Sequence, residues 1–565
     1  MKTVRFRLLL VLGIVLVLTT ACGLGETPTP TPSTSATPDP NALTVATSSE
    51  MTTLLSKLAD QFNGQYKGKT GYVPVKILTA SPSDMVTAAL QSDPAFQVIN
   101  PDSSIWLSKL NNEWAKAFAS ETTGNDTLPL PRQRFSLPQR YAASPVVIAM
   151  WEKVAQGMGW PAKAIGWNDL QERASQDASF HWNPPSTAYA SGLLATLAEF
   201  YAGAGVNRDL SADLATQDNT LAYVRKVEGT VRFYGEGEVD ILDRLKTDGT
   251  SLLDAFVAQE QIVLRWNQAN PGQKLAAIYP VEGTLWADHP LALLELYNDF
   301  DHATLSNAQR DTYAEFARFL AASDAQKQVL AEGFRPMDLS LDLQGSGSPF
   351  KGNPDVDPLQ PKTTLPVPAY SVIQVIEDYR IYIKKPTNVF LVVDTSGSMA
   401  TSNKLPRVQT ALTSFIASIV GKNDRLGLID FSDHIKYNSG MQPVTDSYKA
   451  TLTARVQGMR ADGNTAILDS VNEAFTALQK LNQPQAINAI VVMTDGKENS
   501  SNISQQKLES NIKAGQVPVV IFSIAFGSDA DPQIMQRLAS LTNGQFRQAE
   551  TFNIEDLYKL IATYF

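Results

Sequence analysis

Cysteine and histidine are scarce in this sequence, with one cysteine and four histidines among 565 residues. A single cysteine cannot form an intramolecular disulfide, so the stability of the fold must come from ordinary hydrophobic cores. The histidines show no paired or H-E-x-x-H spacing, and the sequence has no G-x-S-x-G or Walker motif. We therefore expect a binding protein and not an enzyme; a metal-assisted hydrolase is the alternative.

Runs of basic residues are missing outside the extreme N-terminus, and the formal net charge is −10. Because a phosphate backbone attracts clustered lysine and arginine, this charge balance argues against nucleic acid as a partner. Hydrophobic residues make up 43% of the chain, which is enough for sizeable cores. The length predicts about three domains.

The apolar run near the N-terminus, Leu8 to Leu18, is shorter than the roughly 20 residues of a membrane-spanning helix. It follows three basic residues and precedes small residues and Cys22. This arrangement resembles a bacterial lipoprotein signal peptide over residues 1–21, which implies a lipid on Cys22 and an extracytoplasmic location at the cell membrane. Thr19 departs from the Leu that the family prefers there, so a plain signal peptide or an uncleaved anchor is the alternative.

A stretch rich in Thr and Pro, from Glu26 to Pro40, follows the cysteine and has almost nothing to bury. Alternating prolines favour an extended polyproline II conformation, about 3.1 Å per residue. We interpret residues 22–41 as a lipid-anchored spacer that holds the folded domains away from the membrane, or as a plain disordered linker.

Residues 42–344 alternate short apolar runs with helical patterns. The runs at 73–78 and 146–150 are predicted strands, and the patterns at 51–62 and 313–320 are predicted helices. Such alternation predicts an α/β region with mainly parallel sheets.

Polar turns interrupt this region at several predicted strand and helix ends. Leu43–Met51 is a strand that ends in hydroxyls, Pro184–Thr187 leads into a helix, and Ile278–Thr284 runs into a tight turn. Together with Gly333–Pro336 after a long helix, these segments resemble an extracytoplasmic solute-binding protein of the type II periplasmic class. The resemblance implies a two-lobed fold that closes on a ligand.

Helix N-termini with neighbouring hydroxyls suit a small polar or anionic solute. A Ser or Thr before a helix is also an ordinary N-cap, worth about 1 kcal/mol without any ligand. A vestigial cleft that serves as a recognition surface is a second alternative. The ligand contacts that the resemblance implies are Ser48, Ser49, Ser103, Ser104, Ser144, Ser186, Thr187 and Glu282.

A segment rich in Gly, Ser, Pro and Asp, residues 345–369, is the predicted interdomain linker. Residues 370–383 follow as a helix or a strand and open the last domain, 370–565. Its continuous apolar runs are typical of strands buried on both faces of a parallel sheet. We expect an open, doubly wound α/β sheet with ligands at the carboxyl ends of the strands. The predicted strands are 389–393, 426–431, 487–493 and 517–524.

Two acidic and three hydroxyl side chains stand at those carboxyl ends. Asp394, Ser396 and Ser398 form a D-x-S-x-S motif after the first strand. Thr465 precedes a helix, and Asp495 follows another strand. Oxygen-only ligands select a hard cation such as Mg²⁺, or Mn²⁺ in its place. The motifs resemble the von Willebrand factor A domain with its metal-ion-dependent adhesion site, which implies three hydroxyl ligands and two carboxylates that act directly or through water.

Such a site keeps one coordination position open, where a Glu or Asp from a protein partner is favoured. We therefore interpret the protein as a cell-surface lipoprotein that binds an acidic partner through the cation, in adhesion or scaffolding. The alternative is an extracytoplasmic solute receptor for a transporter or signalling system, in which the A domain couples ligand occupancy to a partner.

Overall fold

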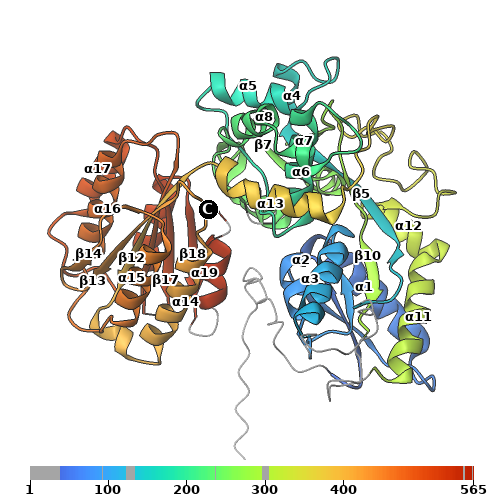
Figure 1. Ribbon diagram of the computed structural model, residues 1–565, viewed down its shortest axis with the longest axis horizontal. Coiled ribbons are helices and arrows are strands. Elements are labelled where there is room, and N and C mark those ends of the chain that lie inside the picture. The colour runs from blue at the N-terminus through green and yellow to red at the C-terminus, as the bar shows by residue number, and fades with distance from the viewer. Residues whose placement is uncertain are drawn as a thin grey trace, which may run out of the picture.

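The computed structural model describes residues 39–91, 93–121, 134–235, 237–295, 305–527, 529–550, 554–562 and 564–565. They form two lobes and a C-terminal domain, with helix α13 (Tyr370–Ile383) at their junction (Figure 1). The predicted signal peptide, Cys22 and most of the spacer lie outside the described residues. Within the described ranges, no helix is both long enough and apolar enough to cross a membrane.

The first lobe is a five-stranded sheet covered by helices. Its parallel strands are joined by a strand that returns antiparallel from the second lobe. Apolar residues of its helices, among them Leu55, Phe62 and Phe316, form the core against the sheet. The strand order is β2 (Val75–Thr79), β1 (Leu43–Thr47), β3 (Val98–Asn100), β10 (Pro290–Leu293) and β4 (Gln139–Arg140). The helices are α1 (Ser49–Tyr66), α2 (Pro82–Ala89), α3 (Ile105–Glu121), α11 (Asn307–Ala321) and α12 (Ser323–Ala331).

The second lobe is built around one long strand, β5 (Ala142–Trp151), in which every residue is buried. This strand pairs antiparallel with four others, so the prediction of mainly parallel sheets is wrong for this lobe. A continuous apolar run shows burial on both faces and leaves strand direction open. The other strands are β6 (Trp182–Asn183), β7 (Ala255–Gln259), β8 (Leu275–Ile278), β9 (Trp286–Ala287) and β11 (Arg335–Pro336). The helices are α4 (Glu152–Gly157), α5 (Trp167–Gln176), α6 (Ala190–Ala204), α7 (Ala212–Ala215), α8 (Asp218–Glu228), α9 (Glu238–Asp248) and α10 (Glu260–Ala269).

The C-terminal domain has the predicted doubly wound sheet. The sheet has a hydrophobic core on each face, and alternate residues of its first strand point into one or the other. Val389 and Leu391 face one helical layer, and Phe390 faces the other. The strand order is β14 (Ile435–Asn438), β13 (Arg425–Phe431), β12 (Thr387–Asp394), β16 (Ile487–Thr494), β17 (Val520–Phe526) and β18 (Gln545–Ala549), with β15 (Gln442–Pro443) beside β13. One face carries α14 (Lys404–Ser418), α15 (Asp446–Gln457) and α19 (Ile554–Ala562). The other carries α16 (Ile467–Leu481), α17 (Gln505–Ala514) and α18 (Pro532–Leu541).

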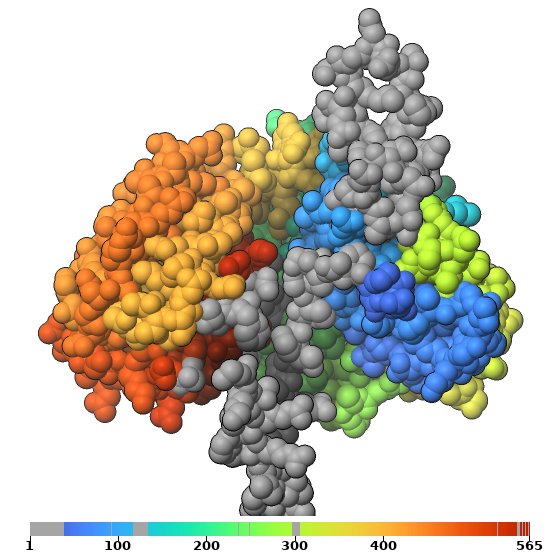
Figure 2. All heavy atoms as spheres, turned by 90° about the horizontal axis from the view of Figure 1, so that it is seen from below, coloured from blue at the N-terminus to red at the C-terminus, as the bar shows by residue number. Residues whose placement is uncertain are grey.

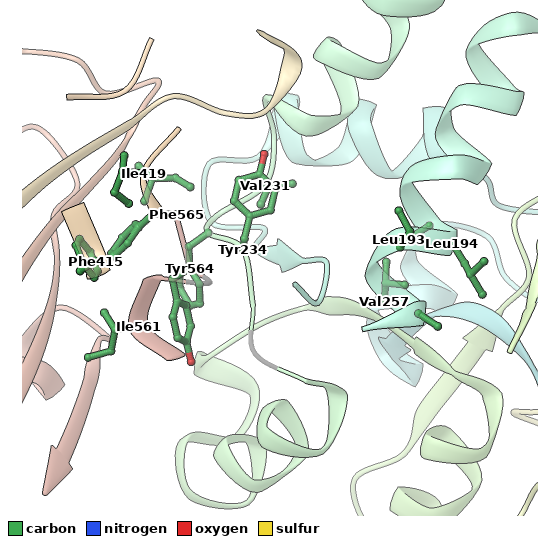
Figure 3. Packing of buried hydrophobic residues seen from close by; sticks show 14 of the residues in the cluster. Leu193, Leu194, Val231, Tyr234, Val257, Phe415, Ile419, Ile561, Tyr564 and Phe565 are labelled. Carbon is green, nitrogen blue, oxygen red and sulfur yellow. The ribbon is translucent and has the colours of Figure 1, made fainter. Parts of the chain in front are cut away.

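The end of the chain docks the C-terminal domain against the second lobe. Tyr564 and Phe565 lie between α14 and the segment that carries Val231 and Tyr234 (Figure 3). The ring of Tyr564 is 5.5 Å from that of Phe233, centroid to centroid. Figure 2 shows the orange-to-red C-terminal domain and the blue first lobe on opposite sides of the molecule. The C-terminal domain is thus held against the second lobe by an apolar contact.

Helix α13 contacts both lobes before the chain enters the C-terminal domain. Its Glu377 pairs with Lys109 of the first lobe at 3.2 Å, and Arg380 lies over the ring of Tyr234 in the second lobe. The preceding segment, predicted as a linker, lies along the second lobe and buries Phe350 and Val356 in its core. The connection between the domains is therefore packed over much of its length.

Candidate functional sites

The predicted metal ligands meet at one edge of the C-terminal sheet. Strands β12 and β16 are adjacent and parallel, with Val393 opposite Met493. Their carboxyl ends therefore place Asp394 beside Thr494 and Asp495. The Thr494 hydroxyl donates a hydrogen bond to Asp394 Oδ2 across the two strands.

The D-x-S-x-S loop folds its hydroxyls toward the second carboxylate. The backbone N–H of Ser396 donates to Asp394 Oδ1 at 2.7 Å, which fixes the start of the loop. The hydroxyl oxygens of Ser396 and Ser398 are 3.1 Å apart, and the Ser398 hydroxyl donates to Asp495 Oδ1 at 2.6 Å.

A third loop brings Thr465 to the same edge. Gly397 N–H donates to Gly463 O at 3.0 Å, which ties this loop to the D-x-S-x-S loop. A Cβ added to Gly496 would lie 2.8 Å from the Thr465 hydroxyl oxygen, so Thr465 sits directly against the loop of Asp495. We call these five side chains, from Asp394, Ser396, Ser398, Thr465 and Asp495, the rim site.

A lysine that sequence reasoning missed completes the rim site. Lys404, at the start of α14, donates from Nζ to Asp495 Oδ2 at 2.7 Å, and both side chains are buried. This ammonium neutralises one of the two carboxylates. A lysine in the first turn of an amphipathic helix looks like a solvated residue in the sequence, so no signal pointed to it.

The electrostatics of the rim site suit a hard cation. Burial raises the pKa of Asp394 to about 6, against the opposing hydrogen bonds from Thr494 and Ser396, and the nearby Asp495 raises it further. A positive charge at this position would favour the ionised form. The donor atoms are all oxygens, as Mg²⁺ and Mn²⁺ prefer, so these residues fit such an ion.

The residues predicted to bind solute are spread over the two-lobed region. Ser48, Ser103 and Ser144 are fully buried. Their hydroxyls have local partners, namely the carboxylate of Glu50, the backbone N–H of Ile105 and the backbone N–H of Gln261.

The adjacent hydroxyls differ from one another. Ser104 is half-buried and bound through its N–H to Asp288, whereas the Ser49 hydroxyl oxygen is buried without a hydrogen-bond partner. These two residues, like Ser48 and Ser103, belong to the first lobe, at the loops that follow β1 and β3.

The remaining predicted contacts lie elsewhere. Ser186 and Thr187 line a cavity of about 270 Å³ between α6, α13 and the end of the chain. Glu282 accepts a hydrogen bond from the Trp167 N–H at the start of α5, at 3.3 Å. Ser186 and Thr187 therefore lie at this cavity, and Glu282 lies at the start of α5.

A second acidic group between the lobes was not foreseen. Glu50, Asp102 and Glu238 are each at most 3% exposed, and Gln259 and His289 lie among them without any exposure. We call these five residues the interlobe group. They are far apart in the sequence and share no motif, so sequence reasoning had no signal for them.

Comparison with curated proteins matches the C-terminal part of the chain. Calcium-activated chloride channel regulator 1 of Homo sapiens is 29% identical over 205 residues, which is 36% of this chain and 20% of that protein. The uncharacterized protein YfbK of Escherichia coli (strain K12) is 25% identical over 170 residues, 30% of this chain and 29% of that protein. The chain thus spans about a fifth of the length of the channel regulators it matches.

Solved structures resemble each half separately. The sulfate-binding protein SubI from Mycobacterium tuberculosis H37Rv is 16% identical, with a TM-score of 0.35, and covers 53% of this chain and 88% of its own. A periplasmic thiamin binding protein is 10% identical, with a TM-score of 0.40, and covers 60% and 95%. A von Willebrand factor type A protein from Catenulispora acidiphila is 18% identical, with a TM-score of 0.29, and covers 32% and 43%.

Two family models match the chain. Residues 388–560 match the von Willebrand factor type A domain. Residues 43–335, more than half of the chain, match the bacterial extracellular solute-binding protein. The protein therefore belongs to the bacterial extracellular solute-binding protein family and carries a von Willebrand factor type A domain after its two lobes.

Proposed function

We propose that the protein is an extracytoplasmic binding protein whose A domain holds a divalent cation, Mg²⁺ or Mn²⁺, and through it binds an acidic residue of a protein partner. The observation that carries this proposal is the meeting of five oxygen-bearing side chains from three loops at the rim site. Solute-binding and A domains are generally non-catalytic binding modules, which supports binding over catalysis.

The charge of the rim site favours an external acidic ligand. It contains two carboxylates, and Lys404 already pairs with that of Asp495 at 2.7 Å. The protein groups therefore leave much of the charge of a dication uncompensated. The cation would supply the positive charge that attracts a carboxylate from outside. Asp394 and the hydroxyls of Ser396, Ser398 and Thr465 would hold the ion.

Calorimetric titration of the full chain with Mn²⁺ tests the cation site. We expect saturable binding in the wild type, and loss of that binding in Asp394→Ala and Thr465→Ala with the fold retained, since both side chains lie at the sheet edge. Asp446→Ala, which removes an exposed carboxylate on α15 of the same domain, is the matched control. Equal Mn²⁺ binding by the wild type and Asp394→Ala would defeat the proposal.

The membrane attachment proposed for Cys22 has a separate test. Replacing Cys22 with Ser removes the thiol that would carry the lipid, so we expect the variant to leave the membrane fraction. A variant that still sediments with membranes would rule out the lipid anchor.

A second candidate function is a solute receptor for a transporter or a signalling system. The burial of polar side chains from both lobes at their contact favours it. Helix α13 contacts both lobes and leads into the A domain, so it offers a route by which solute occupancy could be passed on. Binding of a small solute to the interlobe group is the test of this candidate.

A further inference from the structure

The interlobe group joins acidic residues from both lobes. Glu50 lies in the first turn of α1 and Asp102 in the loop after β3, both in the first lobe. Glu238 begins α9 in the second lobe. The three are close enough to repel one another: Glu50 and Glu238 each raise the pKa of Asp102, whose main cause of elevation is burial.

The group has neutral hydrogen-bond donors. Asp102 accepts from the Trp106 indole N–H at 2.9 Å and from the Ala190 backbone N–H at 2.7 Å. Glu238 accepts from the Gln259 backbone and side-chain N–H groups, both at 2.8 Å. No lysine or arginine in the described ranges forms an ion pair with any of the three carboxylates.

These contacts occupy two helix N-termini, a kind of position that in the sequence suggests a small polar or anionic solute. The N-terminus of the 15-residue helix α6 points its Ala190 N–H at Asp102, and Glu238 occupies the N-terminus of α9. An anionic solute there would meet carboxylates in place of free N–H groups. The interlobe group therefore favours positive charge over the anion that the helix N-termini suggest in the sequence.

A chain of hydrogen bonds runs from Glu238 through Gln259 to His289, and the last acceptor in it, His289 Nδ1, has no donor. Gln259 uses its side-chain N–H for Glu238, so its Oε1 must accept from His289 Nε2, which is 2.8 Å away. His289 Nδ1 is then a lone-pair acceptor, and it is buried without a partner. It faces Glu50 Oε1, a second acceptor, at 3.8 Å. Burial lowers the pKa of His289 to about 3 and so keeps the ring neutral.

We infer that the interlobe group binds a small organic cation that carries an ammonium group. One N–H-bearing atom can lie about 2.9 Å from both His289 Nδ1 and Glu50 Oε1 and donate to each. The buried Ser191 hydroxyl, which lowers the pKa of Glu238 by hydrogen bonding, adds a further polar contact. The positive charge offsets carboxylates that otherwise lie unpaired in the interior. This inference rests on the solute-receptor function, and exchange of the solute requires the lobes to separate.

The test is calorimetric titration of the full chain with ammonium, methylammonium, putrescine and spermidine, with tetramethylammonium, sulfate and Mn²⁺ for comparison. We expect saturable binding of at least one of the first four, at least tenfold weaker binding of tetramethylammonium, which has the charge but no N–H, and no effect of sulfate. Glu50→Gln and Glu238→Gln, which keep side-chain volume and remove charge, should weaken binding at least tenfold. Glu172→Gln, an exposed residue of the second lobe, is the control.

Three results would overturn the inference. The first is no binding of any of the four ammonium probes to the wild type. The second is ammonium binding that Glu50→Gln and Glu238→Gln leave unchanged, with circular dichroism showing both variants folded. The third is a preference for sulfate, or for Mn²⁺ at a site that Glu50→Gln removes. If Glu238→Gln does not fold, Asp102→Asn takes its place.

The same titrations separate this inference from the rim-site proposal. Asp394→Ala should lose Mn²⁺ binding and keep ammonium binding. Failure of the rim site alone would leave ammonium binding intact, and failure of the interlobe group alone would leave Mn²⁺ binding intact.

Discussion

The rim site and the interlobe group both bury carboxylates, but they compensate the charge differently. At the rim site, Lys404 pairs with Asp495, and hydroxyls and loop N–H groups surround the rest. In the interlobe group, Glu50, Asp102 and Glu238 have neutral donors and repel one another. At the rim site the protein itself offsets part of the carboxylate charge. In the interlobe group no cationic side chain of the described residues offsets it.

The difference indicates how each site uses a ligand. A buried charge costs free energy unless it is paired, and a group without a partner tends to take up a proton. The hydrogen bonds from Lys404 and Ser398 hold Asp495 in place, so the rim site is formed before a cation arrives. The interlobe group needs a proton or an external cation to be stable when closed. The two sites should therefore respond differently to metal, to loss of a partner and to pH.

The largest expected effect is on cation binding. Asp394→Ala removes the carboxylate at the end of β12, and we expect complete loss of Mn²⁺ binding in calorimetry. Glu238→Gln in the second lobe should bind Mn²⁺ like the wild type. If Mn²⁺ binding depends on Glu238, the rim site and the interlobe group are not separate cation sites.

The second effect is on stability. Lys404→Met breaks a buried ion pair and leaves Asp495 unpaired, which should lower the free energy of unfolding by about 3 kcal/mol in denaturant titrations. Saturating Mn²⁺ should recover part of the loss, because a dication replaces the missing charge. If the variant loses the same unfolding free energy with and without Mn²⁺, Lys404 does not act on the cation site.

The third effect is on pH dependence. Burial raises the pKa of Glu238 to about 8, with a further contribution from Glu50, while Asp102 and His289 also face the group. The stabilising contribution of protonated Glu238 is fully present below pH 4.5 and is lost as pH rises toward 8, by about 1.4 kcal/mol per pH unit. Thermal unfolding of Glu238→Gln across this window should show a flatter profile. A profile identical to that of the wild type would contradict the assignment.

The smallest effect concerns one hydroxyl. Thr494→Val removes the donor to Asp394 Oδ2 and keeps the side-chain shape, so we expect a loss of about 1 kcal/mol in unfolding free energy. Ser48→Ala removes the corresponding neutral donor from Glu50 and is the matched comparison. If a single donor is worth several kcal/mol at either site, the hydroxyls hold the carboxylates more strongly than we propose.

Sequence alone predicted the C-terminal fold and its candidate site because their signals are local. The D-x-S-x-S motif fixes three residues in one loop, and continuous apolar strands fix where that loop lies. Sequence analysis did not identify Lys404 as part of the site because its partner, Asp495, is distant in the sequence. The interlobe group could not be predicted because Glu50, Asp102 and Glu238 are far apart in the sequence and come together only where the two lobes meet.

The two-lobed region was predicted less fully for a related reason. The apolar run of β5 shows burial without strand direction, so the antiparallel sheet of the second lobe was missed. Ser186 and Thr187 precede a helix as predicted, yet their loop faces α13 and the end of the chain. Local patterns identified these elements, while the contacts that decide their neighbours are distant in sequence.

The most direct test of two separate cation sites is a paired calorimetric titration of the wild type, Asp394→Ala and Glu238→Gln with Mn²⁺ and with putrescine. We predict that the wild type binds Mn²⁺ and at least one ammonium probe, with putrescine as the first choice, that Asp394→Ala loses Mn²⁺ alone, and that Glu238→Gln loses the ammonium probe alone. Retention of Mn²⁺ binding by Asp394→Ala, or loss of both ligands in one variant, would contradict the account.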